Sequence, residues 1–381
     1  MKKVAVITGT RADYGIFRPV LNAIQKSPDL TLSLIVTGMH LSEKFGYTVD
    51  EIERDGFTID AKVPLGLLED TGASMARDAG DCISGLAGVF EQVKPDIILI
   101  LGDRGEMLAA AVTGAYMNIP VAHLHGGEVS GTVDESVRHA ITKLSHIHFP
   151  ATEESAARIK KLGEDDFRIH VVGAPALDTI LSERLIPKEK IAKMFNLDAA
   201  KPIILAVQHP VTTELDDVER QVRETMEALV AIGEQTVLTY PNADAGGRKI
   251  IEVIEQYRQY PFIQIHKNLN HIEYLSLMRL CDVMVGNSSS GIIEAPSFGL
   301  PVVNIGTRQQ GRQRAENIID VGYERDSIVN AIKIALHDKD FRIKCNECIN
   351  PYGNGDAGEK VANILGNLCI SPELLQKRIV Y

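Results

Sequence analysis

Short apolar runs rich in β-branched residues alternate with segments of helical period along the whole chain. These runs are continuous rather than apolar at every second position, which is typical of strands buried on both faces. Strands of this kind that alternate with helices indicate right-handed βαβ units and parallel sheets. The runs expected to form strands are Val4–Thr8, Leu32–Val36, Ile97–Leu101, Val121–Leu124, Ile147–Phe149, Ile169–Val172, Ile203–Val207, Thr236–Thr239, Phe262–Ile265, Val283–Val285 and Val302–Ile305.

The length of the chain and the number of runs predict two domains. A length of 381 residues fits two domains of about 150–200 residues each. So many strands exceed one comfortable sheet, and the pattern restarts beyond the polar segment Ala176–Ala200. We therefore expect two doubly wound, Rossmann-like α/β domains at residues 1–180 and 181–360. A helix expected at Glu359–Leu368 leads into the C-terminal segment 361–381, for which we expect packing against the first domain.

Composition excludes several classes of protein. The chain is 45% hydrophobic and 24% charged, with a net charge of −11 and no lysine- or arginine-rich run, so nucleic acid is not an expected partner. No apolar run reaches the roughly 18–20 residues of a membrane span, and the first run is too short for a signal peptide. The five scattered cysteines argue against a disulfide framework and for a reducing, cytoplasmic location. Cys345 and Cys348 resemble half of a zinc site, but no second pair lies near them in the sequence, and no metal is expected.

The segment Gly286–Gly291, of sequence GNSSSG, is the strongest local sign of a ligand. It follows an expected strand and precedes a helix-like segment, where small residues let backbone N–H groups approach an anion and the helix dipole adds positive potential. The hydroxyl groups of Ser288 and Ser289 add donors. Glu294, one turn into the helix, is placed to accept both hydroxyl groups of a ribose. A phosphate beside a ribose indicates a nucleotide.

Two charged turns follow strands in the first half of the chain. Arg11 lies at the start of a helix, where its charge opposes the dipole, so it is either a solvated arginine or one compensated by a ligand or a carboxylate. The GxGxxG spacing of a dinucleotide site is missing from this turn. Asp103 follows Ile97–Leu101 and is either a helix N-cap or a functional carboxylate. Arg104 beside it would hold a phosphate or a carboxylate.

The densest cluster of titratable residues follows the fourth expected strand. Carboxylates and imidazoles gathered there suit general acid–base catalysis, because like charges and partial burial separate their pKa values. Function is favoured for His125, Glu128 and Asp134, whereas the helix and strand positions of His139 and His146 favour structural roles. The paired glycines after His125 allow an unusual turn.

Polar turns also follow strands in the second half. His209 follows Ile203–Val207 and precedes a proline that stiffens the turn. Asn242 lies in a turn rich in amides and carboxylates, and Arg308 lies in a glycine-bounded loop that suits a pyrophosphate or a base edge. Because ligands of open α/β sheets bind beyond the carboxyl ends of strands, the turns of both halves predict one cleft between the domains.

Together, these segments resemble the UDP-N-acetylglucosamine 2-epimerase family, and in particular its hydrolysing branch. The resemblance covers nearly the whole chain. Each piece is weak alone, but the ordered set is highly specific. The short spacer between Glu128 and Asp134 resembles the hydrolysing branch rather than the non-hydrolysing one. The matching motifs are, in order, RADY, GDR, HGGEVSGTVDESVRHAITK, QHPVTT, PNADAG, GNSSSGxxE and NIGTRQxGR.

The resemblance implies a GT-B-like architecture with UDP in the interdomain cleft. It also implies a reaction in which UDP-GlcNAc and water give UDP and N-acetylmannosamine, for sialic acid biosynthesis, through elimination to 2-acetamidoglucal and hydration. No cofactor or metal is required. The catalytic positions carried over are Asp103, Asp134 and His209. His125 stands where many members have a carboxylate, so either His125 or Glu128 fills that role. The UDP-binding positions carried over are Arg11, Arg104, His209, Asn242, Ser288, Ser289, Glu294 and Arg308.

Other activities fit parts of the same pattern. A hydrolysing 2-epimerase of a UDP-linked 2,4-diacetamido-2,4,6-trideoxyhexose, as in legionaminic acid synthesis, differs only at C4 and C6 of the sugar. A GT-B glycosyltransferase needs fewer proton-handling groups than the 125–134 cluster offers. A catalytically silent UDP-sugar sensor would not need Asp103, Asp134 and His209. The resemblance also suggests a homo-oligomer, either a dimer or a tetramer.

Overall fold

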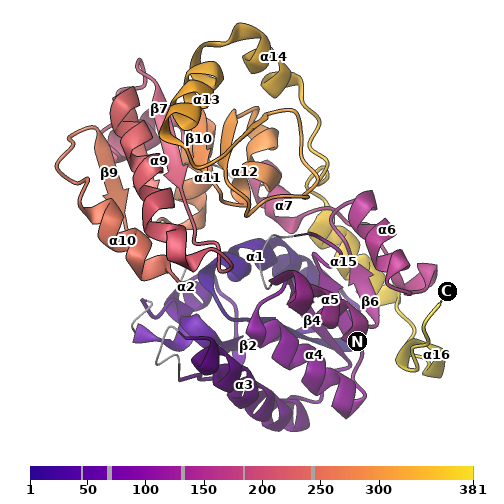
Figure 1. The fold of residues 1–381 in the computed structure, drawn as a ribbon. Coiled ribbons are helices and arrows are strands. Elements are labelled where there is room, and N and C mark those ends of the chain that lie inside the picture. The colour runs from indigo at the N-terminus through magenta and orange to yellow at the C-terminus, as the bar shows by residue number, and fades with distance from the viewer. Residues whose placement is uncertain (44–45, 67–70, 130–133, 183–184, 242–244, 381) are drawn as a thin grey trace. The chain divides into compact units, whose positions relative to one another are not determined.

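The computed structural model describes residues 1–380 apart from 44–45, 67–70, 130–133, 183–184 and 242–244. The described chain forms two compact units (Figure 1). Unit 1 contains residues 1–128, 134–181 and 352–380, and unit 2 contains residues 182–351 together with Val129. Unit 1 is therefore made of both the beginning and the end of the chain.

Unit 1 is built on a six-stranded parallel sheet with the strand order β3-β2-β1-β4-β5-β6. In β1, Val4 and Val6 belong to the core on one face, and Ala5 and Ile7 belong to the core on the other. A strand covered on both faces needs no polar alternation, which explains its continuous apolar sequence. The strands are β1 Lys2–Thr8, β2 Leu30–Thr37, β3 Ile59–Val63, β4 Ile97–Leu101, β5 Val121–Leu124 and β6 Ile147–Phe149.

Helices cover both faces of this sheet. The described helices up to residue 182 and after residue 352 are α1 Arg11–Lys26, α2 Val49–Arg54, α3 Gly72–Val93, α4 Gly105–Met117, α5 Asp134–Leu144, α6 Glu153–Lys161, α7 Pro175–Ser182, α15 Ala357–Asn367 and α16 Pro372–Leu375, with 3-10 turns η1 Gly38–Leu41 and η3 Asp166–Arg168. α1 begins at a capping box made by Thr10 and Asp13 and packs on one face together with α15. The N–H groups of Ala357 and Gly358 donate to the carboxylate of Asp178, which fixes the start of α15. α3, α4 and α5 pack on the opposite face.

Unit 2 has the same plan, with a six-stranded parallel sheet in the order β12-β11-β10-β7-β8-β9. In each sheet the first strand along the chain lies in the middle, beside the fourth, so the predicted doubly wound, Rossmann-like fold is confirmed for both. The strands are β7 Ile203–Val207, β8 Gln235–Thr239, β9 Ile263–His266, β10 Val283–Gly286, β11 Val302–Ile305 and β12 Ile318–Val321. The helices are α8 Lys188–Met194, α9 Val218–Ile232, α10 Gly247–Glu255, α11 His271–Leu280, α12 Ser290–Ile293, α13 Arg325–His337 and α14 Lys339–Glu347, with 3-10 turns η4 Leu215–Asp217 and η5 Ala295–Phe298. No described helix of either unit is long and apolar enough to cross a membrane.

The structure corrects three secondary-structure predictions. Ile169–Val172 is not a strand, since its described ladder contact is a single bridge between Ile169 and His148. β3 and β12 were not predicted; both are edge strands with partly exposed residues, so they lack a continuous apolar run. The segment Ala176–Ala200, expected between the two domains, contains the change from unit 1 to unit 2 after residue 181, together with most of α7 and all of α8.

Candidate active site

The candidate residues of unit 1 follow strands at the centre of its sheet. Arg11 follows β1, Asp103 and Arg104 follow β4, and His125 follows β5. β1 and β4 are neighbours, and the winding of the chain reverses between them. Ligands of doubly wound sheets bind at such a switch point, beyond the carboxyl ends of the strands. The fold therefore favours this edge as a ligand site.

Asp103 is held by an arginine and is not the helix cap. α4 begins with Arg104 as its N-cap residue, with no side-chain capping hydrogen bond. Oδ2 of Asp103 instead accepts a hydrogen bond from Nη2 of Arg138, a buried residue of α5. Nη1 of Arg138 donates to the carbonyl oxygen of Glu128 at 3.1 Å. One guanidinium thus fixes Asp103 and the Glu128 turn relative to each other, while the Asp103 side chain stays 22% exposed.

His125 and Glu128 form a buried imidazole–carboxylate pair. Nδ1 of His125 lies 2.5 Å from Oε1 of Glu128, and the two residues are 7% and 5% exposed. An ionised carboxylate only accepts hydrogen bonds, so Nδ1 carries the proton of this hydrogen bond, and in the neutral imidazole Nε2 presents a lone pair. Among the described residues, Nε2 of His125 has no hydrogen-bond partner. This is the arrangement of a general base oriented by a carboxylate.

The turn that carries this pair is strained, and a glycine makes it possible. His125 has a φ of +60°, in the left-handed region that costs a non-glycine residue about 1–2 kcal/mol. Its N–H donates to the carbonyl of Phe149 at 3.1 Å. At Gly127 φ is +75°, and an added Cβ would lie 2.3 Å from the carbonyl oxygen of Ser155. Strained backbone of this kind clusters at functional sites.

Two nearby histidines have structural contacts. Nε2 of His123 lies 2.7 Å from the carbonyl oxygen of Gly102, and burial lowers the pKa of His123 to about 3. Nδ1 of His146 accepts a hydrogen bond from the N–H of Val121 at 3.1 Å. The described residues contain no group of three or more His, Cys, Asp or Glu side chains that could bind a metal ion.

The two candidate arginines of unit 1 contact carboxylates. Nε of Arg11 lies 2.8 Å from Oε2 of Glu51. Of the alternatives that the sequence analysis left open for Arg11, the structure shows compensation by a carboxylate. Nε of Arg104 donates to Oε2 of Glu106 at 3.3 Å. The arginine side chains are 25% and 36% exposed. Partly exposed ion pairs such as Arg11–Glu51 are worth about 0–1 kcal/mol, so an anionic ligand can compete for Arg11, whereas the Glu106 partner of Arg104 is buried.

Asp13 holds the turn on which Arg11 stands. Its Oδ1 accepts a hydrogen bond from Oγ1 of Thr8 at 2.5 Å, and its Oδ2 accepts one from the N–H of Gly9 at 3.1 Å. Burial raises the pKa of Asp13 to about 6, against the lowering effect of these hydrogen bonds. Asp13 therefore has a structural role beneath the candidate site.

In unit 2, Asn287 ties together the turns that follow β7, β10 and β11. Its side chain accepts from the N–H of His209 at 2.7 Å and donates to the carbonyl of the same residue at 2.9 Å. Its own carbonyl accepts from Nη1 of Arg308 at 3.1 Å and from Nε2 of Gln309 at 2.9 Å. His209 and Arg308 are thereby gathered at the GNSSSG turn.

The GNSSSG turn depends on its glycine and leads into a very short helix. Gly286 has a φ of +131°, and an added Cβ would lie 2.0 Å from the carbonyl oxygen of Val207. α12 has four residues, with Ser289 as its N-cap and Glu294 as its C-cap. A helix of one turn has a small dipole, so anion binding at this turn would depend more on backbone N–H and hydroxyl donors, and less on the dipole, than the sequence suggested.

A chain of hydroxyl groups lies along this turn. Oγ of Ser288 is 2.9 Å from Oγ of Ser290, which is 2.6 Å from the phenol oxygen of Tyr274. Burial raises the pKa of Tyr274, so its phenol stays protonated and is able to donate. Ser288 and Ser289 are half-buried, and Glu294 is 8% exposed.

Glu214 fixes the loop that carries Arg308. Its Oε1 accepts from Oγ1 of Thr307 at 2.5 Å, and its Oε2 accepts from the phenol of Tyr323 and from Nε2 of Gln221, both at 2.7 Å. Burial raises the pKa of Glu214, but these hydrogen bonds outweigh it and lower that pKa overall. An ionised carboxylate thus anchors the loop after β11.

The side chains of two predicted site residues lie outside the described part of the structure. Asn242 lies outside the described residues, and Asp134 begins α5 with a side chain outside the described part of the structure. Sequence reasoning gave no role to Arg138, Asn287 or Glu214. Arg138 stands four residues after Asp134, on the same face of a helix, and that spacing is the available signal.

Comparisons with known proteins show similarity in sequence and in fold. The sequence profile described as UDP-N-acetylglucosamine 2-epimerase matches residues 22–366. A UDP-N,N'-diacetylbacillosamine 2-epimerase (hydrolyzing) of Legionella pneumophila is 44% identical over 381 residues, which is 100% of both chains. A UDP-N-acetylglucosamine 2-epimerase of Neisseria meningitidis is 36% identical, with 96% of each chain covered. The crystal structure of UDP-GlcNAc 2-epimerase from Neisseria meningitidis bound to UDP-GlcNAc has a TM-score of 0.81 at 20% identity, covering 95% of this chain and 99% of that one.

Proposed function

Because this chain belongs to the UDP-N-acetylglucosamine 2-epimerase family, we propose that it is a hydrolysing 2-epimerase of a UDP-linked 2-acetamido sugar. It releases UDP and a free sugar that is inverted at C2. The observation that carries this proposal is the 44% identity, over both full lengths, to a relative named as a hydrolyzing 2-epimerase. The paired His125 and Glu128 and the arginine-bound Asp103 supply the proton-handling groups that such a reaction needs.

Two sugars are candidates for the substrate. The relative that is 44% identical acts by name on UDP-N,N'-diacetylbacillosamine, and the one that is 36% identical acts by name on UDP-N-acetylglucosamine. We therefore propose the 2,4-diacetamido-2,4,6-trideoxy sugar as the better substrate. This ranking reverses the order that the motifs alone suggested. The two sugars share the 2-acetamido group and UDP, so the same chemistry serves both.

The proposed reaction has two balanced stages. A base takes the C2 proton, the C–H electrons form the C1=C2 double bond, and the electron pair of the C1–O bond leaves with UDP. The resulting glycal then takes a proton at C2 on the opposite face, while a water oxygen bonds to C1 and loses a proton. One UDP-sugar and one water give one 2-epimer and UDP.

We assign the proton transfers and the stabilisation of the sugar cation to unit 1. Nε2 of His125 has a lone pair and a supporting carboxylate, which are the requirements of a general base. Asp103, oriented by Arg138 of α5, supplies negative charge for the cationic sugar. Asp134, the first residue of α5, is the third carboxylate that we propose for catalysis, beside Asp103 and Glu128.

We assign UDP to the polar turns of unit 2. Breaking the C1–O bond leaves negative charge on the pyrophosphate, which preorganised donors stabilise without reorganisation. Arg308, Ser288 and Ser289 supply such donors, while Glu294 takes the ribose. His209 completes the set. If this assignment holds, Arg308→Met weakens UDP binding by at least about tenfold in calorimetry, or ~1.4 kcal/mol. An unchanged affinity would remove Arg308 from the UDP site.

Proton NMR in deuterated water tests the whole proposal. The protein is incubated separately with the two UDP-sugars, and the expected product is a free 2-epimer that carries deuterium at C2. Equilibration between two intact UDP-sugars would place the chain in the non-hydrolysing branch. No turnover of either sugar would reject the proposed reaction. Faster turnover of UDP-N-acetylglucosamine would reject the proposed substrate ranking alone.

A further inference from the structure

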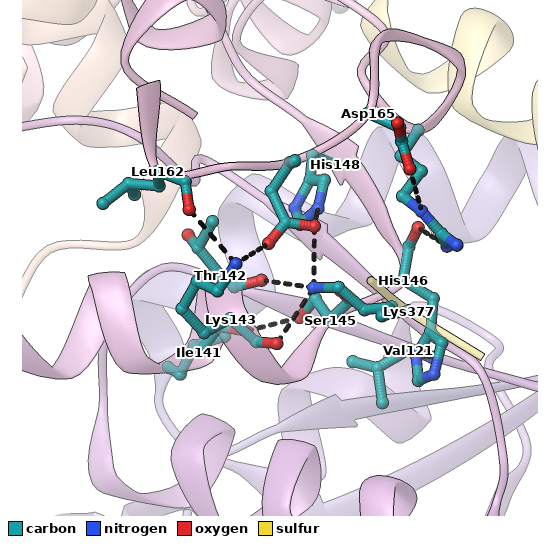
Figure 2. A network of polar contacts seen from close by, with 12 residues as sticks. Val121, Ile141, Thr142, Lys143, Ser145, His146, His148, Leu162, Asp165 and Lys377 are labelled. Atoms are coloured by element: carbon teal, nitrogen blue, oxygen red, sulfur yellow. Dashed lines mark hydrogen bonds and ion pairs between the residues drawn. The ribbon is translucent and has the colours of Figure 1, made fainter. Parts of the chain in front are cut away.

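The last residues of the chain enter a buried polar network in unit 1 (Figure 2). Nζ of Lys377 donates to the backbone carbonyls of Thr142, Lys143 and Ser145, at 3.2 Å and 2.9 Å for the first two. These carbonyls belong to the C-terminal end of α5 and the residue that follows it. The last carbonyls of a helix have no partner within the helix, and the dipole there attracts cations. Lys377 therefore acts as a C-terminal cap supplied by a distant part of the chain.

A buried carboxylate fixes the position of this lysine. Oε2 of Glu164 lies 2.7 Å from Nζ of Lys377 and 3.1 Å from Nε2 of His148, and its Oε1 accepts from Nζ of Lys143 at 2.7 Å. The Glu164 side chain is 1% exposed. Burial raises the pKa of Glu164, but these hydrogen bonds outweigh it and lower that pKa to about 2. Burial also lowers the pKa of His148 to about 4, so a neutral imidazole donates to an ionised carboxylate.

Separate contacts hold the backbone of the C-terminal segment on either side of Lys377. Arg168, which is buried, donates to the carbonyls of Glu373 and Leu374 at 2.7 Å and 2.8 Å. The N–H of Val380 donates to the carbonyl of Gly163 at 3.1 Å. The segment is thus fixed before and after Lys377, and the ammonium group meets α5 in a defined place.

The other half of α5 carries candidate active-site residues. Asp134 is its first residue, and Arg138 binds both Asp103 and the carbonyl of Glu128. From Asp134 to the carbonyl of Lys143 the helix rises about 14 Å, at 1.5 Å per residue. Because a short helix moves as one rigid element, a shift at the Lys377 end changes the position of Arg138 and with it the carboxylate of Asp103.

We propose that Lys377 is a positioning residue, through which the C-terminal segment holds α5 and therefore Arg138 and Asp103 in the geometry that the reaction needs. This inference rests on the proposed function for its kinetic consequence. Its structural consequence, a helix α5 that depends on Lys377, is independent of that function. No contact of Lys377 with substrate is implied.

The test compares Lys377→Met and Lys377→Arg with the wild-type chain. The matched control is Lys160→Met, because Lys160 pairs with the carboxylate of Asp166 at 2.8 Å on the surface of the same unit. Three quantities are measured: amide hydrogen exchange of residues 138–144, kcat for the better UDP-sugar, and the Kd of UDP. For Lys377→Met we expect exchange at least tenfold faster and kcat at least tenfold lower, with the UDP Kd within twofold. Lys377→Arg recovers most of both losses, and the control matches the wild type.

A pH series on the wild type needs no destabilised variant. Burial lowers the pKa of Lys377 to about 8, so its ammonium becomes neutral between pH 7 and pH 9. The other ionisable groups of the described residues that face it are Glu164, Lys143, His146, His148 and Arg168. Exchange at residues 138–144, corrected for the intrinsic effect of pH, rises over this range in the wild type and not in Lys377→Arg, because arginine stays charged.

Several outcomes would overturn the proposal. Unchanged exchange and kcat in Lys377→Met would remove the role of the lysine. Equal impairment of the Met and Arg variants, or a parallel loss of UDP affinity, would show a general loss of folding instead of positioning. A wild type without turnover would reject the proposed function alone, and the exchange measurements would still decide whether Lys377 holds α5.

Discussion

Replacing Glu128 by glutamine tests the role of the His125–Glu128 pair. The substitution keeps the size and shape of the side chain but removes its charge at 2.5 Å from Nδ1 of His125. A hydrogen bond to a charged group is worth about 1.5–3 kcal/mol and a neutral one about 0.5–1.5 kcal/mol, so the imidazolium formed on proton uptake loses about 1–1.5 kcal/mol. The low dielectric of a site that is 7% and 5% exposed increases this loss.

The expected result of Glu128→Gln is therefore a kcat about 10- to 100-fold lower, since each 1.36 kcal/mol corresponds to a factor of ten. UDP affinity stays within about twofold, because we assign UDP chiefly to unit 2. The assay follows UDP release at saturating UDP-sugar and measures UDP binding separately by calorimetry. Glu135→Gln is the matched control, because Oε1 of Glu135 lies 3.7 Å from Nε2 of His139 in a half-buried pair on α5.

Two results would refute this reasoning. Equal kcat values for Glu128→Gln and Glu135→Gln would mean that the carboxylate of Glu128 does not support a base. A loss of UDP affinity as large as the loss of kcat would mean that the substitution disturbs the fold instead of the chemistry.

Further predictions concern single residues and pH. Asp103→Asn lowers turnover by more than about 100-fold while UDP affinity stays within about tenfold, or ~1.4 kcal/mol; equal losses would make Asp103 purely structural. Gly127→Ala destabilises the protein by about 2–4 kcal/mol through left-handed strain and a contact with Ser155, and calorimetry would show a Tm lower by about 5–15 °C. Acid destabilises unit 1 below pH 6.5. Burial lowers the pKa values of four histidines to about 3 or 4 in the folded protein, whereas the unfolded chain protonates the same histidines near pH 6.5. They are His40, His123, His146 and His148. Asp13 offsets the effect of one of these histidine protons on stability. Its pKa is raised to about 6 in the folded state, so the folded protein takes up this proton at a higher pH than the unfolded chain does. The net of roughly three protons from these five residues gives a slope of about 4 kcal/mol per pH unit near pH 5, and a Tm that is equal at pH 7 and pH 5 would contradict it.

The fold was largely predictable because most strands are buried on both faces. The central strands, such as β4 and β7, are fully apolar, and their sequences specify them without knowledge of their neighbours. The edge strands β3 and β12 keep exposed positions, and their pairing depends on the sheet beside them. Ile169–Val172 has strand-like composition, but its described pairing is one bridge, so composition alone misplaced it.

The residue types of the candidate site were predictable from the sequence, but the contacts between their side chains were not. His125 and Glu128 stand three residues apart in the sequence, but their contact depends on a left-handed turn at His125, a conformation that local propensity disfavours. Asp103 looked equally like a cap until Arg138, 35 residues away in sequence, was placed beside it. Such pairings come from tertiary packing, which one sequence does not display.

The order in which the chain is made does not match the order in which unit 1 is completed. Val361, Leu365 and Leu374, near the end of the chain, belong to the same core as Val4 and Val6 of the first strand. At about 5–20 residues per second, a ribosome needs roughly 20–70 s to pass from β1 to these residues. Unit 2 is almost continuous in sequence and emerges in full during that interval. Unit 1, whose first strands are made before unit 2, therefore closes its core after unit 2, and a nascent chain that stalls between unit 2 and α15 would leave unit 1 without the apolar side chains of that helix.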